Sequence, residues 1–341
     1  MIPFSLYTIA IILHWCILLS SLMINTPNGV AHTICPLVFM DYPFHYVHDT
    51  FRRNNCSMSN KWKSNDTDFS PIYYTMKQNV LWNNHSVCVC DTFILIYFNV
   101  FRSDEERRNV IRHYLTQGMM VDGKRINYIF TVASPINDIT AIEKLKKENS
   151  VYGDILISMH EDNRRLLPIT VLDTFLWIRD FCKTAKFVVK TDGDTWVHLD
   201  NLVHYVKSLN MSKVFSGDPH CVRRGKRIMY HEVYAIPYDY PEDVPFVPGG
   251  GYILSQDLIP FVNIGVQYLD VLFPSIEDAI ITKIINKAGV QVQTPRDYIL
   301  YHHYQEGEAI HSNVIFAHNM KSIKRLKEVY NNHSKHSFPS A

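Results

Sequence analysis

The feature that most constrains this chain is a regular alternation of apolar strands and helices between residues 92 and 209. Residues 92–100 form a continuous apolar and aromatic run, which is typical of a strand buried on both faces. Residues 103–106 then form a capping box that opens a helix through Leu115. The pairing repeats, with strands at 126–133, 154–158 and 186–190 and helices at about 137–148, about 168–182 and from beyond Asp194 to about Leu209. This order predicts an α/β fold with a mostly parallel central sheet, whose ligands bind beyond the carboxyl ends of the strands.

The last third of the chain is less regular. Residues 218–250 are rich in proline and are expected to be mostly loop, ending in three glycines before a strand-like run from Tyr252. A capped helix is expected from Ser275 to about Lys287. The tail from Lys321 is basic and polar and is interpreted as a solvated surface helix.

The N-terminus holds an apolar segment from Phe4 to Met23 without Lys, Arg, Asp or Glu. Because roughly 20 such residues can span a bilayer as a helix, residues 1–24 are interpreted as a signal anchor, with a cleaved signal peptide as the alternative. Either would deliver the remainder to the lumen. The expected organisation is then a stem at 25–90, a catalytic domain at 91–330 and a tail at 331–341.

Glycosylation motifs and cysteines agree with a luminal location. Asn-x-Ser/Thr sequons occur at Asn55, Asn65, Asn84, Asn210 and Asn332. Outside the apolar segment, an even set of cysteines suits disulfide bonds whose pairing the sequence leaves open: Cys35, Cys56, Cys88, Cys90, Cys182 and Cys221. The formal net charge of +1 gives no electrostatic reason to expect nucleic acid as a partner.

An acidic turn follows the strand at 186–190. Asp192 and Asp194 flank Gly193 and would emerge at the ligand-binding edge of the sheet. Two carboxylates at this spacing can hold a divalent cation and leave positions open for diphosphate oxygens. The similar Asp66-Thr67-Asp68 lies in the polar stem and is interpreted as incidental.

A second pair of carboxylates, Glu277 and Asp278, stands at the start of a predicted helix. Helix capping alone would explain this position. The functional interpretation is that one of them, Asp278 by preference, takes a proton from an acceptor hydroxyl as a general base.

Three further groups have weaker signals. Residues 249–251 would let the backbone approach a sugar or nucleotide, although a loop hinge explains them equally. Arg107, Arg108 and Arg112 crowd one helix, either to meet phosphates or as a solvated basic face. His318 follows an apolar run and could reach the metal from the end of a strand.

Taken in order, these segments resemble the β1,3-galactosyltransferase and β1,3-N-acetylglucosaminyltransferase family, which is related to Fringe. The resemblance covers about residues 91–330 and is carried by residues 108–114, 148–156, Trp177 with Cys182, 190–197, 240–241 with 249–255, and Glu277 with Asp278. Any one of these matches is modest evidence, but their occurrence in the family's order strongly supports the resemblance.

The resemblance implies a GT-A type fold, Mn²⁺, a UDP-sugar donor, and an inverting transfer that forms a β1,3 linkage on a glycan of a glycoprotein or glycolipid. It also implies a Golgi membrane protein with a single-pass type II anchor. The implied metal ligands are Asp192, Asp194 and His318, and the implied catalytic residues are Asp278 and Glu277. The implied donor-binding residues are Arg108, Arg112, Asp154, Lys190, Asp192, Gly250 and Gly251.

The chain also departs from the family pattern. Gly193 stands where the family has a middle Asp, and Tyr114, Ala279 and residues 166–170 differ as well. Because the outer carboxylates at 192 and 194 remain, an active hexosyltransferase is the leading hypothesis. A catalytically silent glycan-binding protein that kept the fold is the alternative.

Overall fold

The structure is a computed structural model that describes residues 87–222, 228–230, 233–236, 243–267, 276–305 and 307–337. Several expectations lie outside the described residues: the N-terminal anchor or signal peptide, nearly all of the stem, Cys35, Cys56, residues 240–241, Ser275 and the sequons at Asn55, Asn65 and Asn84. Within the described ranges, no helix is both long and apolar enough to span a membrane.

Eight of the described strands form one sheet in the order β13-β7-β12-β5-β1-β3-β2, with β4 also paired to β3. Strands β5, β1, β3 and β4 run parallel to their neighbours in that group, while β12 is antiparallel to β5 and β7. The bounds are β1 Thr92–Asn99, β2 Met119–Val121, β3 Lys124–Ala133, β4 Ile155–Ser158, β5 Phe187–Asp192, β7 Phe215–Ser216, β12 Tyr252–Ser255 and β13 Val292–Gln293. The predicted α/β class and the parallel core of the sheet are confirmed.

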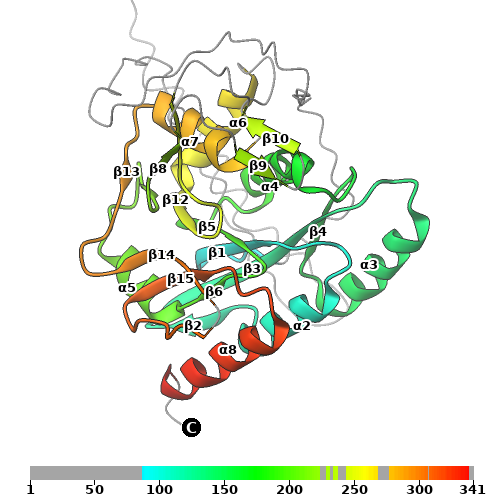
Figure 1. Cartoon of the computed structure of the whole chain (residues 1–341), viewed down its shortest axis with the longest axis horizontal. Coiled ribbons are helices and arrows are strands. Elements are labelled where there is room, and N and C mark those ends of the chain that lie inside the picture. The colour runs from blue at the N-terminus through cyan, green and yellow to red at the C-terminus, as the bar shows by residue number, and fades with distance from the viewer. Residues whose placement is uncertain are drawn as a thin grey trace, which may run out of the picture. The chain divides into compact units, whose positions relative to one another are not determined.

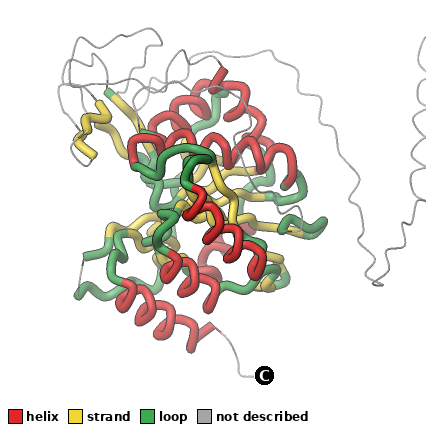
Figure 2. The backbone as a smooth tube through the Cα atoms, turned by 90° about the vertical axis from the view of Figure 1, so that its right-hand side faces the viewer, coloured by secondary structure: helices red, strands yellow, loops and turns green. Residues whose placement is uncertain are grey.

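Helices cover both faces of this sheet (Figure 1). On one face, α4 (Leu167–Phe181), α6 (Ile259–Gln267) and α7 (Glu277–Lys287) pack over a core that includes Leu95 and Tyr97. The other face, which includes Ile94 and Ile96, packs against α2 (Glu105–Tyr114) and α5 (Leu199–Lys207). Figure 2 shows the strands between these groups of helices. Because successive side chains of a strand point to opposite faces, β1 is apolar along its length.

A smaller sheet packs against the same face of the large sheet as α2 and α5. Its strands are β14 (Ile299–His303), β15 (Val314–His318) and β6 (Trp196–Val197), in the order β14-β15-β6. The tail forms α8 (Ile323–Ser337), and its Leu326, Val329 and Tyr330 pack in a cluster with residues of α2, β6 and β15. The tail is therefore the predicted helix, but one of its faces is buried.

The proline-rich region, predicted to be mostly loop, also contains short strands. Residues 218–250 contain β8 (His220–Val222) paired with β11 (Val244–Phe246), and β9 (Ile228–Tyr230) paired with β10 (Val233–Ile236). Strands of three or four residues are too short to show a period of two against the surrounding prolines.

Some element boundaries also differ. Helix α2 is capped by the side chain of Asp104 rather than by Ser103. Helix α3 (Ile139–Tyr152) runs beyond Glu148 and ends where Gly153 adopts a left-handed conformation. Helix α7 begins after Ile276, which provides no side-chain cap, so capping does not explain Glu277 and Asp278.

A disulfide bond joins Cys88, just before β1, to Cys182 at the end of α4. The sequence predicted disulfides but left this pairing open. The bond ties the first central strand to a covering helix, and disulfides persist in the oxidising compartments of the secretory pathway.

Candidate active site

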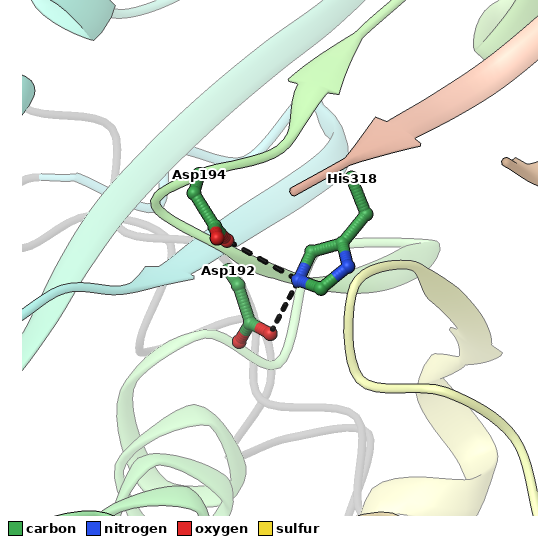
Figure 3. A group of neighbouring side chains, drawn as sticks. All are labelled: Asp192, Asp194 and His318. Carbon is green, nitrogen blue, oxygen red and sulfur yellow. Dashed lines mark ion pairs between the residues drawn. The ribbon is translucent and has the colours of Figure 1, made fainter. Parts of the chain in front are cut away.

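Three potential metal ligands meet at the carboxyl edge of the sheet. Asp192 ends β5, Asp194 lies two residues on, and His318 ends β15 (Figure 3). The imidazole Nε2 of His318 lies 3.5 Å from Asp192 Oδ2 and 3.2 Å from Asp194 Oδ1. One ligand atom from each residue lies within 4.8 Å of the other two. Two carboxylates and an imidazole in this arrangement fit a divalent cation such as Mn²⁺.

The fold itself holds this cluster together. Strand β6, just after the acidic turn, pairs with β15, and the backbone N–H of Met320 donates to the carbonyl of Asp194 at 2.8 Å. From α2, the Arg107 guanidinium donates to the carbonyls of Gly193 at 3.5 Å, Met320 at 3.0 Å and Lys321 at 2.8 Å. The turn that bears Asp192 and Asp194 and the segment after His318 therefore both accept hydrogen bonds from the Arg107 side chain.

The charges of the cluster depend on one another. Burial lowers the pKa of His318, but its hydrogen bonds to Asp192 and Asp194 outweigh burial and raise the pKa to about 9. The other ring nitrogen, Nδ1, lies 3.0 Å from the hydroxyl of Tyr301, which orients the ring. A bound cation would take the place of the His318 proton between the two carboxylates.

Lys190 connects this cluster to the second pair of carboxylates. Its fully buried ammonium group donates to Asp192 Oδ1 at 2.7 Å, Glu277 Oε1 at 2.9 Å and the Gly249 carbonyl at 2.6 Å. Burial raises the pKa of Glu277, but the charge of Lys190 outweighs it, so the pKa of Glu277 is lowered. Glu277 is thus an ionised partner of Lys190.

Asp278 lies in a different electrostatic environment. Its Oδ2 accepts a hydrogen bond from the Gly249 backbone N–H at 2.7 Å, and its carboxyl group lies within hydrogen-bond reach of the Glu277 carboxyl group. Burial, and next the negative charge of Glu277, raise the pKa of Asp278 well above its ordinary value. Two adjacent carboxyl groups with pKa values shifted in opposite directions have separate roles, and Asp278 is the better proton acceptor.

The three glycines before β12 are required by the site's own side chains. A Cβ on Gly249 would lie 2.2 Å from Lys190 Nζ, and one on Gly250 would lie 2.7 Å from His318 Cγ. A Cβ on Gly251 would meet the ring of Phe316 at 2.2 Å. The close approach predicted for this segment is therefore to side chains of the protein itself.

Two cavities meet at the metal-ligand cluster, and both are lined by Asp192, Asp194 and His318. The larger, of about 690 Å³, also contains Glu277, Asp278, Phe246 and Tyr301. The smaller, of about 430 Å³, extends over the ends of β1 and β3, where it is lined by Asn99 and Thr131. The site can therefore hold an elongated ligand that passes a metal ion midway.

Known proteins share this sequence pattern. Residues 106–296 match the family described as Galactosyltransferase. The chain belongs to the galactosyltransferase family. Membership makes it a glycosyltransferase, an enzyme that moves a sugar, and confirms the family resemblance predicted from the sequence. The predicted GT-A type class agrees with the α/β fold described above.

Individual relatives of this galactosyltransferase-family chain have below 30% sequence identity to it. UDP-GalNAc:beta-1,3-N-acetylgalactosaminyltransferase 1 of Mus musculus is 28% identical over 243 residues, which cover 70% of this chain and 73% of the relative. Lactosylceramide 1,3-N-acetyl-beta-D-glucosaminyltransferase of Xenopus tropicalis is 26% identical over 309 residues, covering 86% and 76%. A solved glycosyltransferase involved in glycosylation of the PBCV-1 major capsid aligns with a TM-score of 0.37 and 10% identity, covering 70% of this chain and 99% of that one. At that TM-score the likeness carries no further argument.

Of the predicted donor-binding residues of this glycosyltransferase, five line neither cavity: Arg108, Arg112, Asp154, Lys190 and Gly251. Arg108 is buried and forms an ion pair with Glu148 at 2.6 Å. Arg112 binds both Glu148 and the buried Asp154 at 2.7 Å. Because these guanidinium groups are occupied by carboxylates and line neither cavity, they support the packing of α2, α3 and β4 rather than contact phosphate.

Two other cations, which were not predicted, lie at this site. Arg164 and Lys321 line both cavities, and in the part of the chain that the structure describes neither side chain forms an ion pair or hydrogen bond. Sequence reasoning missed them. Arg164 begins a short 3₁₀ helix, η2 (Arg164–Leu166), after β4 at the carboxyl edge of the sheet, and that position was the available signal.

Proposed function

We propose that this glycosyltransferase moves a hexose, galactose or an N-acetylhexosamine, from a UDP-sugar to a hydroxyl of a glycan on a glycoprotein or glycolipid. The product is a β1,3 linkage, formed by a single displacement with inversion. The names of the relatives support this donor and linkage class. The observation that carries the proposal is that Asp278 lines the same cavity as the three potential metal ligands.

In this mechanism Asp278 takes the proton of the acceptor hydroxyl as its oxygen attacks the anomeric carbon of the sugar. The bond from that carbon to the diphosphate breaks, and its electron pair leaves with UDP. Asp192, Asp194 and His318 would hold Mn²⁺, which when bound neutralises charge on the leaving diphosphate. Arg164 and Lys321 add positive charge at the same place.

Assaying the full-length protein in detergent with Mn²⁺, a panel of UDP-sugars and glycan acceptors tests this proposal. We expect transfer with one donor class, loss of transfer with a chelator, and recovery when Mn²⁺ is restored. The matched control is Asp278→Asn, which keeps the size of the side chain but cannot take the proton. Binding of donor and acceptor by the wild-type protein without turnover for any pair would favour the silent glycan-binding protein instead.

We also propose that the chain is anchored in the Golgi membrane by residues 1–24 as a single-pass type II protein, with its catalytic domain in the lumen. The uncharged N-terminal segment, the sequons and the Cys88–Cys182 disulfide support this location. Detecting residues 1–24 on the mature membrane-bound protein would exclude cleavage of a signal peptide, and glycans on Asn210 or Asn332 would show luminal exposure.

A further inference from the structure

Asn99 occupies a central place at the carboxyl edge of the sheet. It is the last residue of β1 and pairs in register with Asp192 on β5 and with Thr131 on β3. Neighbouring strands lie about 4.8 Å apart, so Asn99 stands one strand and Thr131 two strands away from the metal-ligand turn. Asn99 is 9% exposed and lines the smaller cavity.

The two halves of the Asn99 amide differ in their partners. The hydroxyl of Thr131, which also lies 3.5 Å from the Phe98 carbonyl oxygen, donates a hydrogen bond to Oδ1 and favours this orientation of the amide. The amino group Nδ2 is buried and has no partner among the described residues. Leaving a buried donor unsatisfied is unfavourable, so an acceptor supplied by a ligand would stabilise this arrangement.

The division of the site into two cavities indicates which part of a ligand comes here. The larger cavity contains Asp278, so the sugar and the attacking hydroxyl belong there. The metal ligands lie where the cavities meet and mark the position of the diphosphate. In a nucleotide-sugar the diphosphate joins the sugar at one end to the nucleoside at the other. The nucleoside therefore enters the smaller cavity, over the ends of β1 and β3.

We propose that the Nδ2 amino group of Asn99, held by Thr131, donates a hydrogen bond to the carbonyl oxygen at C4 of the donor's pyrimidine base and thereby selects uracil over cytosine. Uracil has an acceptor oxygen at that position, whereas cytosine has an amino group that would face the Asn99 amino group. C4 is the ring atom opposite the bond to ribose and so enters the cavity deepest. This inference rests on the proposed function, because it assumes a nucleotide-sugar donor.

The test measures affinities of UDP and CDP for the full-length protein in detergent with Mn²⁺, by calorimetry or by inhibition of transfer. For the wild type we expect UDP to bind about tenfold or more tightly than CDP. Asn99→Asp exchanges the donor for an acceptor in a side chain of the same shape, so the preference should disappear or reverse. Thr131→Val frees the amide to rotate and should bring the ratio of affinities toward one.

Asn127→Asp is the matched control. Asn127 is a buried asparagine near the opposite end of β3, where its amino group donates to the carbonyl of Val87, and it lines neither cavity. The Asn127→Asp variant should change the stability of the protein without changing the ratio of its affinities for UDP and CDP. If Asn99→Asp does not fold, Thr131→Val decides the outcome alone.

The outcomes separate the inference from the proposed function. A wild-type protein that binds neither nucleotide with Mn²⁺ present contradicts the proposed function itself. A wild type that binds UDP and CDP equally, or an Asn99→Asp variant that folds and weakens both by the same factor, overturns the role of Asn99 and leaves the proposed function standing.

Discussion

The ammonium group of Lys190 lies 2.9 Å from the carboxylate of Glu277, the residue immediately before the proposed base. The same group lies 2.7 Å from Asp192, so one buried cation joins the metal-ligand cluster to the segment that bears Asp278. Burial lowers the pKa of Lys190, but the charges of Asp192 and Glu277 outweigh it and raise that pKa well above its ordinary value. The ammonium group therefore stays charged at neutral pH.

Lys190→Met should lower the free energy of unfolding by about 3–5 kcal/mol, because it leaves the buried Glu277 carboxylate without its counter-ion. Urea denaturation followed by circular dichroism measures the change. Lys207→Met is the matched control, since Lys207 pairs with Asp122 at the surface, where the side chains are 40% and 60% exposed. That variant should lose less than about 1 kcal/mol. Equal losses in the two variants would contradict the structural role of Lys190.

Activity should fall as the pH drops through the pKa of Asp278, because only the ionised carboxylate accepts a proton. The negative charge of Glu277 helps to raise that pKa. Glu277→Gln removes this charge, so the pKa of Asp278 falls and the acidic limb of kcat/KM against pH moves to lower pH. Profiles measured with a saturating concentration of Mn²⁺ check this. An acidic limb at the same pH in Glu277→Gln would mean that another group controls it.

Arg107→Met should weaken Mn²⁺ binding by about 10–100-fold, because the lost guanidinium holds the carbonyls beside two of the proposed ligands. Titration with Mn²⁺ followed by calorimetry measures the affinity. Arg325→Met is the control: Arg325 also donates to a backbone carbonyl, that of Glu308, but it lines neither cavity. If both variants bind Mn²⁺ as the wild type does, Arg107 has no part in positioning the ligands.

Much of the domain could be predicted because its signals are local. Strand β1 is apolar on both faces, and the acidic turn at Asp192 directly follows an apolar strand, so the sheet and the position of this turn at its edge could both be predicted from neighbouring residues. His318 was harder, since it lies more than a hundred residues along the chain. Only the pairing of β15 with β6 brings it to the turn.

The arginines show why the rest could not be predicted. Arg107, Arg108 and Arg112 share one helix and look alike in the sequence, yet Arg107 holds the metal-ligand turn while the other two bind Glu148 and Asp154. Those carboxylates come from a distant helix and loop, and nothing near the arginines in the sequence specifies them. Charge in a sequence indicates a possible partner, and only the tertiary fold decides which one is present.

Gly249→Ala should abolish most transfer activity. A Cβ there would lie 2.2 Å from Lys190 Nζ, 2.4 Å from Glu277 Oε1 and 2.5 Å from Asp278 Oδ1, so the backbone or these two carboxylates must move. A displacement of about 1 Å at a catalytic group can lower the rate about 100-fold, and kcat under saturating donor and acceptor measures it.

Gly123→Ala is the control: its φ of 69° strains any other residue, but no atom lies within 4 Å of the added Cβ. It should lose about 1–2 kcal/mol of stability and keep its kcat. Full activity in Gly249→Ala would show that the carboxylates need not lie where the structure places them.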